Sequence, residues 1–221
     1  MIVVDDGSRQ ECQHIFEDLS EQSGCVVLHH EINQGKGRVL KTAFSHYLKS
    51  YPEYWGVVTA DADGQHLPTD IYRTAQAILI ASVHECTPLG SHVGNTMALG
   101  TRNFDEEQVP FKSRNGNKIT TRAFKLLFGK WINDTQTGLR AISNGFIPMC
   151  LEIKGERFEY EINVPICAVK QRLDIIEVPI ETVYFDNNRE THFHPIKDSA
   201  RIYLIMLASF FVSADRESSR S

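Results

Sequence analysis

Two acidic pairs follow short apolar runs. Asp5 and Asp6 come after the apolar start of the chain, and Asp61 and Asp63 come after the apolar run 55–60. An apolar run that ends in Asp, Gly or Ser predicts a strand leading into a loop. Ligands of open α/β sheets bind just outside such strand ends, and loop carboxylates there can hold a hard cation together with diphosphate oxygens. A lone Asp-x-Asp is usually a solvated turn, but the strand before this one and the Gly-Gln-His after it favour a metal site.

Basic residues that could bind phosphate stand at three further places. Lys36 lies between two glycines at the start of a predicted helix, and a helix N-terminus of this kind can cradle phosphate. A simple turn leading into the helix explains the same pattern equally well. Arg102 follows a predicted strand and Arg114 lies in the next polar stretch, and the guanidinium fork suits phosphate. Surface arginines are common, so spacing alone leaves both open.

A dense polar cluster, DTQTGLR, begins at Asp134 and leads into a predicted strand. An acid in this place could act as a general base or orient an acceptor, although a turn or capping role is the alternative. Further on, His192 and His194 point the same way if the segment is extended. No third ligand is close in the sequence, which favours a phosphate or structural contact over a zinc site.

The elements needed to position these residues alternate along the chain. Strands are expected at 1–4, 25–29, 55–60, 97–100, 139–142 and 175–179. Helices are expected at 9–22, 36–49, 68–81, 118–128, 161–170 and 201–212, with a polar loop at 104–117. This order predicts a doubly wound α/β sheet flanked by helices.

Composition narrows the class of protein. The 221 residues fit one large domain, with 42% hydrophobic and 23% charged residues, as in ordinary globular proteins. A net charge of −5 gives no reason to expect a nucleic-acid partner. The five cysteines form no C-x-x-C pair, which favours reduced thiols in the cytoplasm. The apolar run 202–214 is shorter than the ~18 residues of a spanning helix, and is either a core or surface helix or one that lies on a membrane.

Taken together, these segments resemble family 2 glycosyltransferases of the GT-A fold, in particular the dolichol-phosphate mannosyltransferase and polyprenyl-phosphate glycosyltransferase group. The resemblance rests on segments that occur in the family's order along nearly the whole chain: IVVDDGS from 2, NQGKG from 33, ADADGQH from 60, GTR from 100, DTQTGLR from 134, THF from 191 and DS at 198.

The resemblance implies a role for each candidate residue. Around the donor it implies that Asp5, Asp6 and Lys36 lie by the nucleotide and that Arg102 binds the donor phosphates. It also implies that Asp61, Asp63 and Gln65 surround Mg²⁺ or Mn²⁺ and the donor diphosphate, so that Asp61 takes part in binding the nucleotide sugar. At the acceptor it implies a catalytic Asp134, with Asp63 also serving catalysis through the metal, and phosphate contacts from Arg114, Arg189 and His192. The implied reaction is inverting, metal-dependent transfer of a hexose from a donor such as UDP-glucose or GDP-mannose to a polyprenyl phosphate.

The same resemblance sets expectations for organisation and location. Residues 1–200 would form the GT-A domain, 201–214 an apolar helix associated with a membrane, and 215–221 a disordered tail. The family normally begins with one further strand and helix, so the first strand is expected to have an edge without its usual neighbour, which could lead to oligomers. The expected place of action is the cytoplasmic face of a membrane. A saccharide or protein hydroxyl as acceptor, and an inactive remnant, remain the alternatives.

Overall fold

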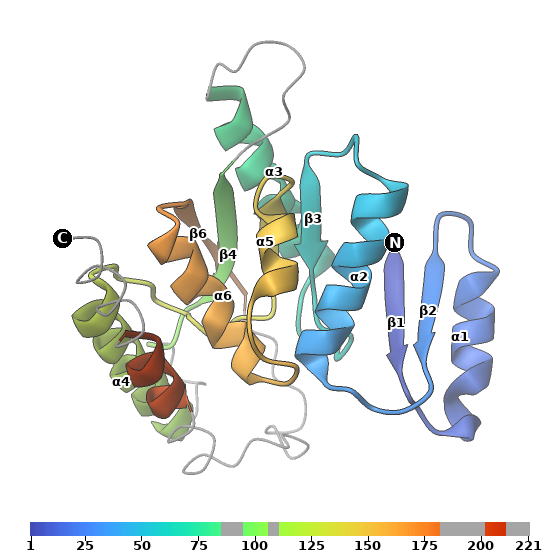
Figure 1. The fold of residues 1–221 in the computed structure, drawn as a ribbon, viewed down its shortest axis with the longest axis horizontal. Coiled ribbons are helices and arrows are strands. Elements are labelled where there is room, and N and C mark those ends of the chain that lie inside the picture. Colours follow the sequence, from blue (N-terminus) through green and yellow to red (C-terminus); the bar gives the residue numbers. More distant parts are fainter. Residues whose placement is uncertain (85–94, 106–110, 182–201, 211–221) are drawn as a thin grey trace.

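The computed structural model describes residues 1–84, 95–105, 111–181 and 202–210 (Figure 1). Its strands are β1 (Ile2–Asp6), β2 (Val26–His30), β3 (Gly56–Thr59), β4 (Thr96–Arg102), β5 (Arg140–Ser143) and β6 (Asp174–Ile180). Its helices are α1 (Gln13–Ser20, preceded by the 3-10 turn Gln10–Cys12), α2 (Lys36–Ser50), α3 (Pro68–His84), α4 (Phe111–Phe128), α5 (Ile147–Glu152), α6 (Glu159–Lys170) and a final helix at 202–210. Strands and helices alternate, which confirms the predicted α/β class.

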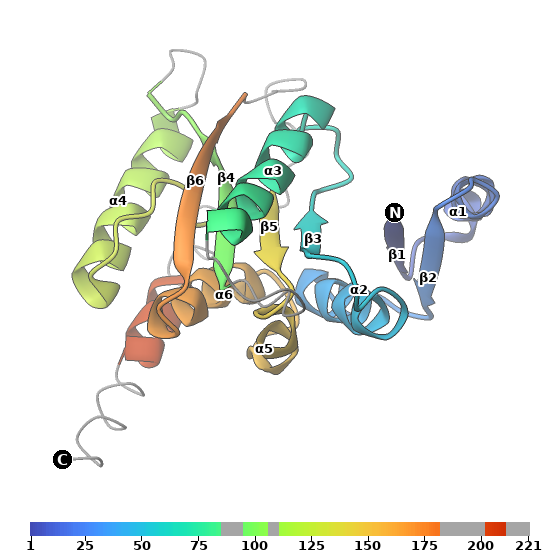
Figure 2. The same ribbon diagram turned by 90° about the horizontal axis from the view of Figure 1, so that it is seen from above.

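The larger sheet has four strands in the order β3-β5-β4-β6. β4 pairs in parallel with β6, whereas β5 runs antiparallel to both β3 and β4. Helix α3 covers one face of this sheet, and α2, α5 and α6 lie on the opposite face (Figure 2). The carboxyl ends of β3, β4 and β6 therefore lie at one edge of the sheet, and residues that follow these strands can meet there.

β4 lies at the centre of the core and is buried on both faces. Met97 and Leu99 point into the main cluster, where they pack with Phe124 of α4. The intervening Ala98 faces Ile78 of α3 on the other side. Strands covered on both faces read as continuous apolar runs, which is why this one was visible in the sequence.

β1 and β2 form a second, smaller sheet. They pair in parallel with Ile2 opposite Val26, and α1 and α2 pack against them. β1 and β3 are the facing edge strands of the two sheets (Figures 1 and 2), and neither has a hydrogen-bonded strand on its other edge in the part of the chain that is described. An unpaired edge at the first strand was expected, but the sequence predicted one continuous sheet, whereas the described residues form two.

Three elements differ from the sequence-based expectation. β1 continues through Asp6, so the acidic pair ends the strand rather than following it. Helix α4 begins at Phe111, inside the stretch expected as a loop, because its Thr120 and Phe124 pack inward and compensate for a polar start. The short helix α5 was not anticipated, since its six residues are too few to show a helical period.

The final helix packs onto the domain rather than projecting from it. Met206 is fully buried and Tyr203 lies against the main core. Lys170 Nζ donates a hydrogen bond of 2.8 Å to the carbonyl oxygen of Ser209, which ties the helix to α6. In the described part of the chain no helix is long and apolar enough to cross a membrane. The expected tail at 215–221 lies outside the described residues.

Candidate active site

Asp61 lies just beyond β3, where basic side chains approach it from two sides. Its Oδ1 atom is 2.7 Å from Lys36 Nζ, and its Oδ2 atom is 3.7 Å from His66 Nε2. Burial by itself would raise the pKa of Asp61, but the interaction with His66 and the charge of Lys36 outweigh it and hold the pKa well below its ordinary value. Asp61 is therefore an anion at neutral pH.

Gly138 leaves the space that the Asp61 carboxylate occupies. A Cβ atom at Gly138 would lie 2.3 Å from Asp61 Oδ2. Thr59 Oγ1 donates a hydrogen bond of 2.9 Å to the Gly138 carbonyl oxygen, which fixes the end of β3 to the segment that leads into β5. The position of Asp61 thus depends on a residue that has no side chain.

A hollow opens beside Asp61 at the edge where β3, β4 and β6 end. Its walls come from four segments of the chain and are largely polar. They consist of Asp61, Gln65, His66, Arg102, Gln136, Gly138, Ile180 and Glu181. The structure thus brings together three of the predicted site residues, Asp61, Gln65 and Arg102. Asp63 is exposed nearby, where its Oδ1 accepts a hydrogen bond of 2.9 Å from the Gln65 backbone N–H.

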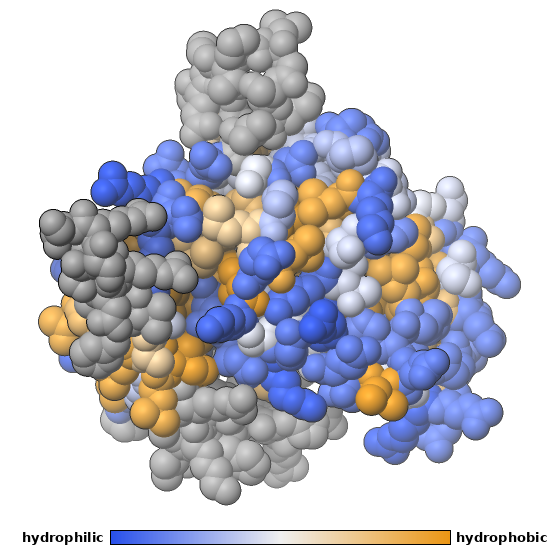
Figure 3. Space-filling view, viewed as in Figure 1, coloured by the Kyte–Doolittle hydropathy of each residue, from blue (hydrophilic) through white to orange (hydrophobic). Residues whose placement is uncertain are grey.

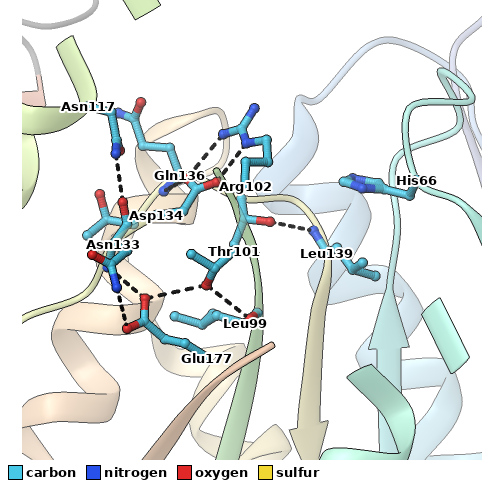
Figure 4. A network of polar contacts seen from close by, with 12 residues as sticks. His66, Leu99, Thr101, Arg102, Asn117, Asn133, Asp134, Gln136, Leu139 and Glu177 are labelled. Carbon is cyan, nitrogen blue, oxygen red and sulfur yellow. Dashed lines mark hydrogen bonds and ion pairs between the residues drawn. The ribbon is translucent and has the colours of Figure 1, made fainter. Parts of the chain in front are cut away.

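Arg102 ends β4 and is held by Asp134 (Figure 4). Arg102 Nε donates to Asp134 Oδ2 at 2.6 Å, and Nη2 donates to Oδ1 at 3.1 Å. The Asp134 side chain is fully buried, and its Oδ1 also accepts from the Gln136 backbone N–H at 3.3 Å. Both carboxylate oxygens of Asp134 are thus engaged, and their contacts fix the plane of the guanidinium beside the hollow.

A second acid, Glu177 of β6, holds the segment that contains Asn133 and Asp134. Glu177 Oε1 accepts a 2.6 Å hydrogen bond from the Asn133 backbone N–H, and Oε2 accepts one of 2.9 Å from Asn133 Nδ2. Thr101 Oγ1 donates to Glu177 Oε1 at 3.4 Å. Figure 4 shows this network on the far side of Arg102 from His66. Glu177 is not among the residues predicted from the sequence, although an acid inside an apolar strand was an available signal.

Asp5 and Asp6 bind the protein's own loops. Asp5 accepts a hydrogen bond of 2.8 Å from the Ser8 backbone N–H and lies 3.1 Å from His29 Nδ1. Asp6 accepts from the backbone N–H groups of Gln34, at 2.9 Å, and Gly35, at 2.8 Å. Burial would raise the pKa of Asp5, but the hydrogen bonds lower it to about 2, and the pKa of Asp6 is lowered in the same way.

The loop that Asp6 holds delivers Lys36 to the site. Lys36 begins α2, and its Nζ atom contacts Glu161 Oε1 at 2.6 Å as well as Asp61. Burial would lower the pKa of Lys36, but the charges of Glu161 and Asp61 outweigh burial and raise it. Asp6 is therefore connected to Asp61 only indirectly, through the loop that it holds and through Lys36. Neither Asp5 nor Asp6 lines the hollow.

Comparison with known proteins decides the family. The family model for glycosyl transferase family 2 matches residues 1–125. The chain is 31% identical over 199 residues to a UDP-N-acetylglucosamine--dolichyl-phosphate N-acetylglucosaminyltransferase of Methanococcus voltae, a match that covers 83% of this chain and 74% of that protein. It is 26% identical over 209 residues to glycosyltransferase AglJ of Haloferax volcanii, covering 92% and 60% respectively. The chain belongs to glycosyltransferase family 2.

A solved structure supports the fold of this glycosyltransferase. The crystal structure of glucosyl-3-phosphoglycerate synthase from Mycobacterium tuberculosis in complex with phosphoglyceric acid superposes with a TM-score of 0.59 at 15% identity. The match covers 94% of this chain and 68% of that one. The expected GT-A fold and the assignment as a glycosyltransferase enzyme are both confirmed.

Three side chains that follow β3 are of the types that hard divalent cations prefer as ligands. Within the described ranges, no group of three or more His, Cys, Asp and Glu side chains could hold a metal ion. Asp61 and Asp63 nevertheless supply carboxylates and Gln65 an amide oxygen, which are the ligands that Mg²⁺ and Mn²⁺ prefer. The space at Gly138 keeps the Asp61 carboxylate from being crowded out. Such ions are usually held by one or two carboxylates, with water and substrate phosphates in the remaining positions.

Three of the acceptor-side predictions stay predictions for this transferase. Arg114 is half-buried in α4 and does not line the hollow beside Asp61. Arg189 and His192 lie outside the described residues. His66 and Glu161 are additions that the sequence did not assign. His66 enters the sequence-based prediction only as the last residue of the ADADGQH motif, and Glu161 only as the first residue of an expected helix.

Proposed function

We propose that this enzyme transfers a sugar from a nucleotide sugar to a polyprenyl phosphate, with a divalent cation at Asp61. The observation that carries the proposal is that the Asp61 carboxylate and the Arg102 guanidinium line one hollow. An anion that can hold a metal and a cation that can hold phosphate, side by side, match a diphosphate leaving group. Mg²⁺ or Mn²⁺ held by Asp61, Asp63 and Gln65 would offset the charge that develops on that group.

The contacts of Asp134 favour an acceptor that is already anionic. A hydroxyl acceptor needs a base to remove its proton, whereas Asp134 is buried with both oxygens engaged, chiefly by Arg102. A lipid phosphate needs no base, and its attack from the face opposite the diphosphate inverts the anomeric carbon. The Methanococcus relative is named for a dolichyl-phosphate acceptor. A saccharide or protein hydroxyl remains the second candidate, with Asp134 as the base.

An exposed face of α4 fits the membrane on which such a lipid resides. Lys118, Arg122 and Lys125 are exposed on α4, which contains no acidic residue, and Lys130 is exposed just beyond its end. The apolar side chains that accompany them are Ile119, Leu126, which is 85% exposed, and Trp131 from this segment, and Leu204, Leu207 and Phe210 from the final helix. Figure 3 shows apolar side chains gathered over this region. We propose that this face lies on the cytoplasmic surface of an anionic membrane.

Transfer assays with defined donors and acceptors test the proposal. The purified chain is incubated with labelled UDP-N-acetylglucosamine, UDP-glucose or GDP-mannose and with dolichyl or undecaprenyl phosphate in detergent. We expect label to enter the lipid phase with Mn²⁺ and to stay in water with EDTA. Asp61→Asn should abolish transfer, while Asp18→Asn, an exposed acid on α1, should not change it.

Other outcomes separate the candidates. Label that enters a soluble saccharide or a protein but never the lipid would favour the hydroxyl acceptor. A transfer rate in EDTA equal to that in Mn²⁺ would contradict the proposed metal dependence. Neither transfer nor donor hydrolysis under any condition would favour the inactive remnant.

A further inference from the structure

Two carboxylates share the Lys36 ammonium group. Lys36 Nζ is 2.7 Å from Asp61 Oδ1 and 2.6 Å from Glu161 Oε1. Asp61 is the more open of the two, with a side chain 31% exposed, whereas Glu161 is 13% exposed. Glu161 also lies in the first turn of α6, where the positive end of the helix favours an acid. A cation thus already sits on the carboxylate that the proposed metal needs.

We propose that Lys36 is a built-in counter-ion that competes with the divalent cation for Asp61, and that Glu161 is the positioning residue that retains Lys36 when the metal binds. The inference rests on the proposed metal-dependent function. It assigns to Glu161 a role that acts only through Lys36, and to Lys36 a role in setting the affinity of the site for metal.

Electrostatics and chain geometry both support a shift of Lys36 from Asp61 toward Glu161 when the metal binds. A divalent ion on Asp61 would stand close to the ammonium group and repel it, so the ammonium must shift or the metal must bind weakly. A lysine has a flexible four-carbon stem, and Glu161 is already within contact distance. The backbone before Lys36 is fixed because Asp6 accepts hydrogen bonds from Gln34 and Gly35. Only the side chain needs to move.

Mn²⁺ binding to the purified full chain, measured by electron paramagnetic resonance without nucleotide, tests the idea directly. Lys36→Gln removes the competitor and should raise the affinity for Mn²⁺ roughly two- to fivefold, as expected for a partly exposed ion pair. Glu161→Gln leaves Lys36 to Asp61 alone and should lower the affinity by a similar factor. Arg38→Gln is the matched control, because it removes a charge from the same helix that pairs with Glu156 instead, and it should change little.

Two further variants test whether Glu161 acts through its contact with Lys36 or through its negative charge alone. Glu161→Asp keeps the charge but shortens the side chain, and should lower the affinity in the same direction as Glu161→Gln. In the Lys36→Gln background, Glu161→Gln should lose most of its effect. Thermal unfolding in EDTA checks that each variant is folded, and a variant that does not fold is replaced by Lys36→Met or Glu161→Ala.

The possible failures are distinguishable. If wild type binds Mn²⁺ but Lys36→Gln binds it no better, the competition is wrong while the metal-dependent function stands. If Glu161→Gln has its full effect without Lys36, Glu161 acts on the metal directly and the positioning role is wrong. If neither wild type nor Lys36→Gln binds Mn²⁺, the metal site fails and this inference fails with it.

Discussion

At the residue scale, the site depends on charged partners and on the missing side chain at Gly138. Asp61 is oriented by Lys36 and His66 on one side and by the open space at Gly138 on the other. Arg102 is oriented by Asp134, whose own surroundings are fully buried. Asp61 and Arg102 each have a partner that fixes the side chain, and in the proposed function this is the preorganisation that stabilises a charged leaving group.

Filling the space at Gly138 should impair the site more than it destabilises the fold. Gly138→Ala places a Cβ atom 2.3 Å from Asp61 Oδ2, so the carboxylate must turn away, and overpacking of this kind costs about 1–3 kcal/mol. We expect a loss of more than about tenfold in transfer rate. Gly116→Ala is the control, because it meets nothing within 4 Å in helix α4 and should be neutral or slightly stabilising. Initial rates and thermal unfolding of both variants check this, and an active Gly138→Ala enzyme would contradict it.

Replacing Asp134 should separate orientation from base catalysis. Asp134→Asn loses the charge-assisted pair with Arg102, which for a buried partner costs about 2–4 kcal/mol. If Asp134 only orients Arg102, the transfer rate falls at every pH and the shape of the pH–rate profile is kept. If Asp134 is the base, the acidic limb of the profile disappears. We expect the first result, measured as kcat/KM against pH, with the exposed Asp105→Asn as a control that stays near wild type.

At the element scale, strands and long helices were predictable and the polar supports of the site were not. β3 and β4 could be predicted because each apolar run ends in polar or charged residues. α2 could be predicted because its apolar residues recur at helical spacing. The pairing of Arg102 with Asp134 was not visible, because the two residues lie 32 positions apart and meet only when β4 and β5 pair. Glu161 was hidden for the same reason, since its partner lies on another helix.

The start of α2 should be sensitive to the smallest enlargement. Gly35 has φ of +97°, and a Cβ atom there would lie 2.6 Å from the backbone oxygen of Glu156. Gly35→Ala therefore combines backbone strain of about 1–3 kcal/mol with a collision against backbone that cannot turn aside. Gly24→Ala separates the two, because Gly24 has φ of +79° but meets nothing within 4 Å. Urea unfolding should show Gly35→Ala to be the more destabilised, and equal losses would rule out the collision.

At the scale of the whole molecule, the loop before α2 connects the smaller sheet to the site. Asp6 of β1 holds Gln34 and Gly35, and the next residue, Lys36, reaches Asp61 beyond β3. β1 and β3 themselves share no strand pairing in the described chain. The smaller sheet is thus joined to the site by ionised carboxylates and by helix packing, and its stability should follow the protonation of those carboxylates.

The free energy of unfolding should therefore fall at acidic pH as these carboxylates become protonated. The folded-state pKa values of Asp5, Asp6 and Asp61 all lie below the ordinary value of 3.8, with that of Asp5 at about 2. A group whose folded pKa is depressed stabilises the native state above the unfolded pKa, and that stability is lost as pH falls through the folded pKa. We expect the free energy of unfolding in urea to be level from pH 7 to about 5 and to fall steadily toward pH 2. Asp5→Asn should be less stable than wild type at pH 7, and the difference should shrink as the pH approaches 2, where wild-type Asp5 is half protonated. A difference that stays constant with pH would show that Asp5 stabilises the fold by shape and neutral hydrogen bonds, so that the link between the two sheets is not electrostatic.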